Sequence, residues 1–211
     1  MKHLVLLISG RGSNLQAILE AAQAQGWMDS VRGVISNRAD AAGLQVAQRF
    51  GVPTLVVPHT DFASREAFDQ ALGDAIASWQ ADVIALCGFM RVLGQAFVAR
   101  FAGRVVNIHP SLLPSFPGLN THARALQEGV KWHGATVHLV SSALDHGPIL
   151  AQAVVPVRDD DTPQTLAERV LEQEHRIYPP VIRALLEDRV HIDGLRTRIL
   201  PGADGPAEEA R

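Results

Sequence analysis

The sequence predicts an α/β fold, an open and mostly parallel twisted sheet with helices on both faces. Strand-like apolar runs alternate with longer segments of helical periodicity through the first half of the chain, the pattern of βα units. Unusual polar residues directly follow several of these runs, as expected where ligands bind at the carboxyl ends of strands. With 211 residues, 47% of them hydrophobic, the chain can bury a full core.

Apolar periodicity, caps and breakers define each element. Strands are predicted at 4–9, 31–36, 54–57, 82–87, 104–109, 134–140 and 148–157, with an edge strand at 190–192. Helices are predicted at 14–25, 41–50, 64–79, 95–101, 122–128 and 162–187. We expect Ser13 or Asn14 to cap the first helix, and Pro179-Pro180 to interrupt the last. Residues 201–211, rich in Gly, Ala, Pro and Glu, are predicted to form a flexible tail.

Composition excludes several classes of protein. The net charge of −3, from 19 Lys and Arg against 22 Asp and Glu, does not fit a general nucleic-acid binder. Cys87 is the only cysteine, so the chain can form neither an internal disulfide nor a thiolate zinc cluster, and a reducing compartment fits best. We expect Cys87 to be a buried core thiol. The apolar run at 4–8 is too short for a signal peptide, and no run approaches a membrane span, which predicts a cytoplasmic protein.

A glycine-rich turn joins the first predicted strand to the first helix. It reads S-G-R-G-S-N at residues 9–14. Glycines permit a tight turn, and a helix N-terminus presents unpaired N–H groups to an anion, so we predict a phosphomonoester site at Gly12, Ser13 and Asn14. The turn is not a full dinucleotide fingerprint, because Leu15 replaces the third glycine. A tight turn without a ligand remains the alternative.

Asn107 and His109 end the fifth predicted strand. Residues two apart on a strand face the same side, so an amide and an imidazole project together. Such a pair can stabilise an oxyanion and move a proton. Asp145, in a turn between two predicted strands, could orient the His109 ring and favour its charged form. The alternative is a hydrogen-bonded polar strand end and an ordinary turn aspartate.

Two other chemistries are less favoured. Ser111 close to His109 and Asp145 would suggest a hydrolytic triad, but the chain has no G-x-S-x-G elbow. The chain has nine histidines, yet no H-E-x-x-H or similar ligand spacing, so we predict no metal site.

The motifs together resemble the phosphoribosylglycinamide formyltransferase family, the folate-dependent enzymes of purine synthesis. The resemblance extends from about residue 2 to residue 189. It rests on I-S-G-R-G-S-N-L at 8–15, G-F-M-R-V-L at 88–93, N-I-H-P-S-L-L-P at 107–114, P-G-L-N-T-H at 117–122, G-A-T-V-H-L-V at 134–140, L-D-H-G-P-I-L-A-Q at 144–152 and E-Q-E-H-R-I-Y-P at 172–179.

The resemblance implies one formyltransferase domain over residues 1–200, with a Rossmann-like phosphate-binding half at 1–104 and a catalytic and folate-binding half at 105–200. Its implied reaction moves the formyl group of 10-formyltetrahydrofolate, a co-substrate, to the amine of 5'-phosphoribosylglycinamide, without a metal. A formyltetrahydrofolate hydrolase and a non-catalytic binding module are the alternatives. The implied partners are small-molecule substrates, with no nucleic acid and no membrane, and the protein is expected to be a monomer or a homodimer.

The resemblance also implies a role for each matching residue. Asn107 would polarise the formyl oxygen, His109 would be the general acid, and Asp145 would support the charged imidazole. The remaining implied roles are the ribonucleotide phosphate for Gly12, Ser13 and Asn14, the ribose for Glu174, the folate for Arg65, Met90, Arg91, Val92, Leu93 and Asn107, and the active-site wall for His138. Arg11 and His146 depart from the family pattern, and we expect them to affect phosphate affinity and pH dependence respectively.

Overall fold

The computed structural model describes residues 2–202 of the chain. The chain divides into two compact units, Met1–Val106 and Asn107–Arg211. The tail predicted at 201–211 lies, from residue 203 onward, outside the described residues.

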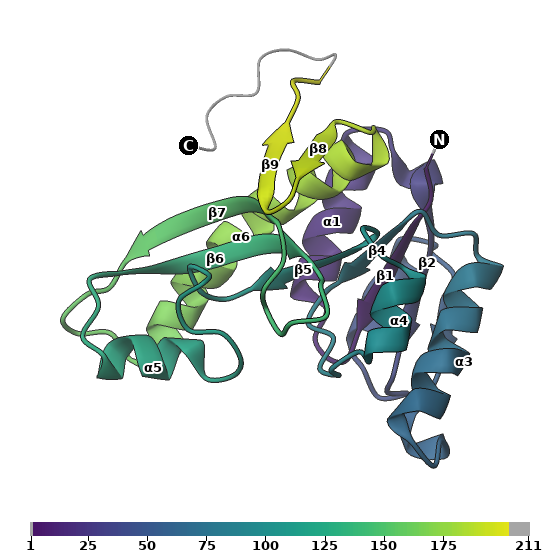
Figure 1. Cartoon of the computed structure of the whole chain (residues 1–211), viewed down its shortest axis with the longest axis horizontal. Coiled ribbons are helices and arrows are strands. Elements are labelled where there is room, and N and C mark those ends of the chain that lie inside the picture. Colours follow the sequence, from purple (N-terminus) through teal and green to yellow (C-terminus); the bar gives the residue numbers. More distant parts are fainter. Residues whose placement is uncertain (1, 203–211) are drawn as a thin grey trace. The chain divides into compact units, whose positions relative to one another are not determined.

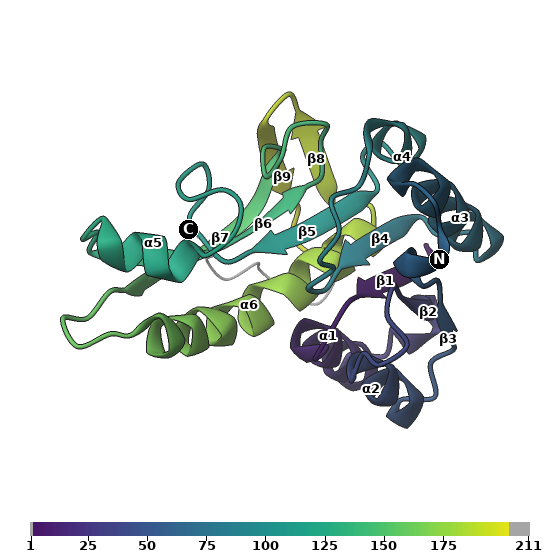
Figure 2. The ribbon, with the colours of Figure 1, turned by 90° about the horizontal axis from the view of Figure 1, so that it is seen from below.

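The first unit is a parallel sheet with helices on both faces. Its strands β1 (Leu4–Ile8), β2 (Val31–Ser36), β3 (Thr54–Val56) and β4 (Val83–Leu86) are hydrogen-bonded in the order β3-β2-β1-β4. Every pairing is parallel, and β1 is buried throughout because it lies between β2 and β4 while helices cover both faces of the sheet. In Figure 2, α1 (Ser13–Ala24) and α2 (Gly43–Arg49) cover one face, and α3 (Arg65–Ser78) and α4 (Gln95–Arg100) cover the other. This arrangement confirms the predicted fold class. Two short 3₁₀ turns, Met28–Ser30 and His59–Asp61, were not predicted.

The second unit packs a long helix against an antiparallel pair of strands. Strand β5 (Val105–His109) enters this unit at Asn107 and is followed in the sheet by β6 (Trp132–Leu139) and β7 (Ile149–Pro156). β6 and β7, the strands predicted at 134–140 and 148–157, pair antiparallel. Helix α6 (Pro163–Leu186) runs along both strands, and the short α5 (Thr121–Gln127) packs on α6 (Figure 1).

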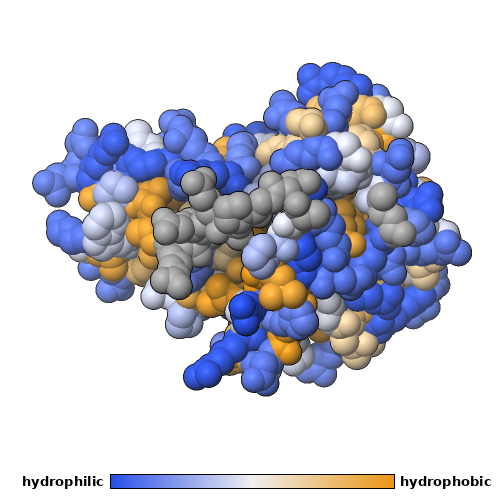
Figure 3. Space-filling model, turned by 90° about the horizontal axis from the view of Figure 1, so that it is seen from above, coloured by the Kyte–Doolittle hydropathy of each residue, from blue (hydrophilic) through white to orange (hydrophobic). Residues whose placement is uncertain are grey.

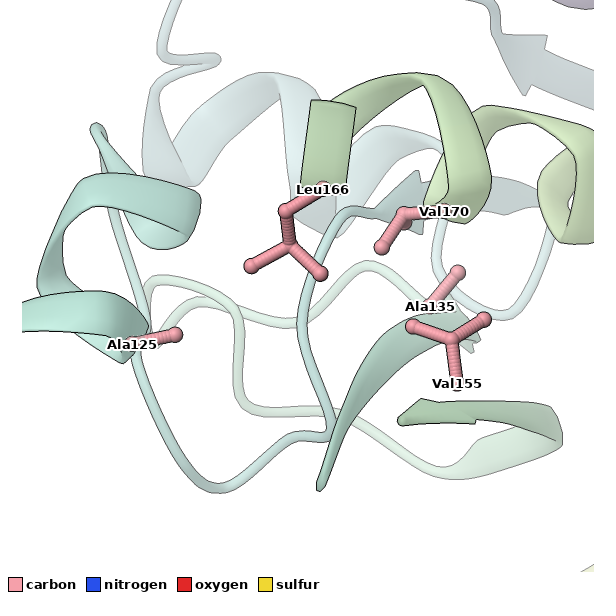
Figure 4. Packing of buried hydrophobic residues seen from close by; sticks show 5 residues of the cluster. All are labelled: Ala125, Ala135, Val155, Leu166 and Val170. Atoms are coloured by element: carbon pink, nitrogen blue, oxygen red, sulfur yellow. The ribbon is translucent and has the colours of Figure 1, made fainter. Parts of the chain in front are cut away.

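A small apolar cluster fixes α6 and α5 to the strands. Figure 4 shows Leu166 and Val170, one turn apart on α6, above Ala135 of β6 and Val155 of β7. Ala125 of α5 completes the cluster, and all five side chains are buried. Because α6 shows apolar residues at helical spacing, its buried stripe meets the sheet while its polar face stays in water.

Helix α6 corrects the prediction that Pro179-Pro180 interrupts the last helix. The helix continues through both prolines to Leu186. Each proline removes one backbone donor. Tyr178, Val181 and Ile182 are buried beside them, and this tertiary packing outweighs the missing hydrogen bonds.

One further prediction is wrong in detail. The first helix is capped by Gly12 and not by Ser13 or Asn14, and no side chain bonds at this cap. The edge strand predicted at 190–192 is confirmed as β8 (Val190–Asp193), which pairs with the unpredicted β9 (Arg196–Ile199) in a separate two-stranded sheet. Ser64 caps α3, its hydroxyl oxygen accepting a hydrogen bond from Ala67 N at 3.2 Å.

Among residues 2–202, no helix has both the length and the apolar character needed to cross a membrane. On the face of the protein in Figure 3, hydrophobic residues form separate patches among hydrophilic ones.

Candidate active site

The end of β5 presents the amide and the imidazole that the sequence predicted. Asn107 is partly buried and His109 is buried, while Ile108 between them is part of the core. Strand alternation therefore places the two polar side chains on one side of β5. Both find partners within the second unit.

His138, the predicted wall residue, orients Asn107. Its Nδ1 lies 3.0 Å from the carbonyl oxygen of Leu139, so Nδ1 carries the proton and donates it. Burial lowers the pKa of His138, which keeps the ring neutral and its Nε2 without a proton. That Nε2 accepts a hydrogen bond from Asn107 Nδ2 at 3.3 Å. The amide therefore has a fixed orientation, with a second N–H to offer.

A register irregularity between Val137 and His138 lies in the pairing of β6 with β7. An irregularity of this kind changes the direction of the side chain that follows it. The imidazole of His138 thus comes from a strand whose regular alternation has been interrupted. The alternating sequence at 134–140 carries no sign of this.

His109 lies between two hydrogen-bond acceptors. Its Nε2 is 3.0 Å from the carbonyl oxygen of Phe116, and its Nδ1 is 3.6 Å from Asp145 Oδ2. The two side chains are 8% and 11% exposed, so water screens their interaction weakly. Each ring nitrogen of His109 therefore faces an oxygen acceptor.

Asp145 is held by the loop that follows β5. Its Oδ2 accepts a hydrogen bond from Gly118 N at 2.7 Å. Asp145 itself has a φ of 47°, a left-handed conformation that aspartate tolerates better than most residues. The structure therefore brings Asn107, His109, Asp145 and His138 together in one unit, as the sequence predicted for the first three.

Two further histidines, the half-buried His122 and the buried His133, adjoin the site, and the sequence did not assign them a role. The rings of His122 and His133 lie edge to face, 5.3 Å apart, and His133 also meets Phe116. Burial lowers the pKa of His122, and the charge of His109 lowers it further. Burial and the neighbouring His122 bring the pKa of His133 down to about 4. Both rings are thus neutral at neutral pH and do not compete with His109 for a proton.

The glycine turn forms as predicted in the first unit. Gly12 has a φ of 75°, and a Cβ there would lie 2.7 Å from the Cα of Gly43, so only glycine fits. Helix α1 begins at Ser13 with no side-chain cap, so its first backbone N–H groups point out of the helix end. Asn14 is buried and Ser13 half-buried. The geometry suits an anion.

The predicted folate residues occupy the loop after β4 and the start of α3. Arg91 is exposed, and the side chains of Met90 and Val92 are 66% and 59% exposed. Arg65 is the first residue of α3 and is exposed.

The other candidates have simpler surroundings. Glu174, the predicted ribose ligand, is buried on α6. Ser111 donates its hydroxyl proton to Ser115 O at 2.7 Å and is fully buried, which does not suit a nucleophile. Cys87 is a buried free thiol, as expected. In the described part of the chain, no three His, Cys, Asp or Glu side chains are grouped to hold a metal ion.

An amide donor, an imidazole and a carboxylate in one polar cluster define an enzyme that polarises a carbonyl group and transfers a proton. Comparison with known protein families shows to which family the chain belongs. Residues 2–182 match the family described as formyl transferase. The chain belongs to the formyl transferase family.

Individual relatives and solved structures show which members of this family the chain resembles. The chain is 48% identical to phosphoribosylglycinamide formyltransferase of Escherichia coli (strain K12) over 188 residues, 89% of either chain. It resembles the crystal structure of glycinamide ribonucleotide transformylase 1 from Symbiobacterium toebii with a TM-score of 0.91 and 46% identity, covering 95% of both chains. A formyltetrahydrofolate deformylase structure from Pseudomonas syringae pv. tomato is more distant, at 30% identity and a TM-score of 0.84, covering 95% of this chain and 67% of that one.

Proposed function

We propose that the protein transfers the formyl group of 10-formyltetrahydrofolate to the amine of 5'-phosphoribosylglycinamide. The products are formylglycinamide ribonucleotide and tetrahydrofolate, a step of de novo purine biosynthesis. The observation that carries this proposal is 48% identity to the Escherichia coli enzyme of that name over 89% of both chains. The Asn107, His109 and Asp145 cluster supplies the chemistry that the reaction needs.

Asn107 acts on the formyl oxygen. The amine attacks the formyl carbon, and negative charge develops on the oxygen as the new C–N bond forms. His138 fixes one N–H of the Asn107 amide, so the other can donate to this oxygen without first having to reorient. A donor positioned in advance stabilises the transition state more than a mobile one.

His109 moves the proton. The bond from the formyl carbon to N10 breaks, and N10 takes a proton from the imidazolium as tetrahydrofolate leaves. The amine loses a proton when it becomes an amide, and that proton restores His109, so charges and protons balance. Phe116 O and Asp145 Oδ2 each face one of the two ring nitrogens of His109. During the transfer, N10 therefore replaces one of these two oxygens as the acceptor. Asp145 stabilises the positive charge of the ring while His109 is protonated.

The binding roles are also proposals. Gly12, Ser13 and Asn14 hold the ribonucleotide phosphate at the start of α1. Glu174 accepts the ribose hydroxyls. Residues 90–93, together with Arg65 and Asn107, contact the folate, and His138 lines the site. Residues 1–200 act as one domain, with a phosphate-binding half at 1–104 and a catalytic and folate-binding half at 105–200.

The setting in which the enzyme works completes the proposal. It acts on small molecules in the cytoplasm, as a monomer or a homodimer, without nucleic acid or membrane. Small-molecule substrates fit the family to which the chain belongs.

The test is an assay of tetrahydrofolate formation from 10-formyltetrahydrofolate, with and without 5'-phosphoribosylglycinamide. The proposal requires turnover that depends on the ribonucleotide, at equimolar formation of both products. Formate release without the ribonucleotide would instead identify a hydrolase. A hydrolase is the second candidate because the chain also resembles the Pseudomonas syringae deformylase structure. A control without protein measures spontaneous hydrolysis.

A further inference from the structure

The loop of residues 89–94, which follows β4, is held at each end by a buried polar side chain. Near its start, Met90 N donates to Ser9 Oγ at 2.8 Å. At its end, Gly94 N donates to Asp69 Oδ2 at 2.7 Å. Ser9 and Asp69 are each 7% exposed. Between the two attachment points the side chains of Met90 and Val92 face solvent.

The burial of the Asp69 carboxylate is unfavourable for the stability of the protein. It lies on α3, and its Oδ1 is buried without a hydrogen-bond partner among the described residues. Burial raises the pKa of Asp69, and the Gly94 N–H and the charges of Arg65 and Arg91 only partly oppose this. A buried carboxylate with one hydrogen bond is usually less stable than an apolar side chain of similar size. This points to a role in positioning Gly94.

Gly94 and Asp69 fit closely. A Cβ at Gly94 would lie 2.9 Å from Asp69 Oδ2, while the φ of −74° at Gly94 is open to any residue. The backbone conformation therefore does not require glycine here. Glycine is required because the Asp69 carboxylate lies so close to the backbone that a Cβ would clash with it.

Ser9 connects the loop to the ends of two strands. It follows β1 directly, and its hydroxyl donates to Asn37 Oδ1 at 2.6 Å while it accepts from Met90 N. Asn37, just after β2, is in turn 3.1 Å from His59 Nδ1 through its amide nitrogen. The hydroxyl that holds Met90 therefore belongs to the first residue of the glycine turn.

We propose that Ser9 and Asp69 are positioning residues for folate binding, which fix the two ends of the 89–94 loop. The inference rests on the proposed function, which supplies the ligand of this loop. Neither side chain touches a substrate. Because both ends of this short loop are fixed, the backbone of residues 90–93 already has its binding conformation before the pterin binds. Binding therefore costs less conformational entropy.

The first experiment compares Asp69→Ala and Asp69→Asn. In Asp69→Ala we expect KM for 10-formyltetrahydrofolate to rise about tenfold, the effect of one lost charge-assisted hydrogen bond. We expect kcat and KM for the ribonucleotide to stay within about threefold, since Asp69 acts only on the loop. Asp69→Asn keeps an oxygen acceptor for Gly94 N and should recover most of the loss. Asp74→Ala is the matched control, because Asp74 also joins α3 to α4 through Arg100 without touching the loop.

The second experiment releases the other end of the loop. Ser9→Ala should raise the same KM, whereas Ser36→Ala should not, because the Ser36 hydroxyl at the end of β2 bonds, among residues 2–202, to the backbone of Arg38 and not to the loop. Gly94→Ala should behave like Asp69→Ala, since its methyl group displaces the carboxylate. If the two attachments act on one loop, the double variant Ser9→Ala/Asp69→Ala should raise KM by less than the product of the single effects.

Hydrogen–deuterium exchange at Met90 N and Gly94 N gives a readout independent of turnover. Both amides should exchange faster in Ser9→Ala and Asp69→Ala than in the two control variants. Faster exchange with an unchanged folate KM would overturn the inference, as would a lower Tm with exchange and KM both unchanged. A wild-type protein without ribonucleotide-dependent turnover would overturn the proposed function and with it the loop's ligand. An active wild type with indifferent variants would overturn the inference alone.

Discussion

Asp145 Oδ2 lies 3.6 Å from His109 Nδ1 and, through the same oxygen, accepts a hydrogen bond from Gly118 N at 2.7 Å. The other ring nitrogen of His109 is bonded to the carbonyl of Phe116, two residues before Gly118. One carboxylate thus faces the proposed general acid and fixes the loop that contacts its far side. A change at Asp145 acts on both.

Replacing Asp145 can separate these two roles. Asp145→Asn keeps an oxygen for Gly118 N but removes the charge, so we expect kcat to fall about 10²-fold or more while the loop stays in place. Asp145→Ala removes both, and should in addition lower Tm. Steady-state kinetics and thermal unfolding distinguish them. Asp193→Ala, which removes an exposed carboxylate on β8, is the control. Equal Tm values for Asp145→Ala and wild type would show that the carboxylate does not fix the loop.

The hydrogen bond from Asn107 to His138 predicts a coupled pair. Asn107→Ala should lower kcat by about 10²–10³-fold, the effect of losing one oxyanion donor. His138→Ala leaves the amide in place but free to rotate, so a smaller loss of about tenfold is expected. The double variant should be no slower than Asn107→Ala, because His138 acts through Asn107. Independent, multiplying effects on kcat would mean that His138 has a separate function.

The parts of the site that could be predicted from sequence are those with regular geometry. Alternation on β5 places Asn107 beside His109. The glycines between the first predicted strand and the first predicted helix indicate the tight turn. The carbonyl of Phe116 could not be predicted, because it reaches His109 from an irregular loop in which Phe116 has a φ of 54°. The orientation of His138 depends on a strand irregularity, and Asp69 is an ordinary acidic residue in a helical pattern until its burial is known.

The same distinction holds for the fold. The βα alternation of the first unit could be predicted because each element has its own periodicity and breakers. Pro179-Pro180 wrongly indicated an interruption of the helix, since local propensity cannot reveal that Tyr178 and Ile182 are buried. The β9 strand was missed because its four residues alternate between exposed and half-buried positions and carry no apolar run.

The glycine turn gives a prediction about the ribonucleotide. Gly12→Ala places a Cβ 2.7 Å from the Cα of Gly43 and forces an unfavourable φ of 75°, so the turn must shift. We expect KM for 5'-phosphoribosylglycinamide to rise at least about tenfold, the scale of one hydrogen bond to a charged group, with KM for the folate much less affected. Gly26→Ala is a control, because Gly26 has a similar φ of 74° but open surroundings. Equal effects on both KM values would argue against a phosphate site here.

The buried histidines predict a loss of stability in acid. An unfolded histidine binds a proton near pH 6.5, whereas the pKa of His133 in the folded protein is about 4. Below pH 6.5 the unfolded state therefore binds the proton first, and the free energy of unfolding falls by up to about 1.4 kcal/mol per pH unit until pH 4. The lowered pKa values of His122 and His138 act in the same direction.

Chemical denaturation between pH 7 and pH 4 measures this slope. His133→Phe keeps a ring against Phe116 and His122 but cannot titrate, so its slope should be shallower than that of the wild type. His191→Asn, at an exposed position on β8, should leave the slope unchanged. Parallel pH profiles for wild type and His133→Phe would refute the assignment.

The central claim is that His109 transfers the proton to the leaving folate nitrogen. The most direct measurement is single-turnover formyl transfer by His109→Asn with both substrates saturating, beside binding titrations of each substrate. The account predicts a rate about 10²–10⁴-fold below wild type with both dissociation constants nearly unchanged. Transfer at close to the wild-type rate would contradict it and would require another proton donor.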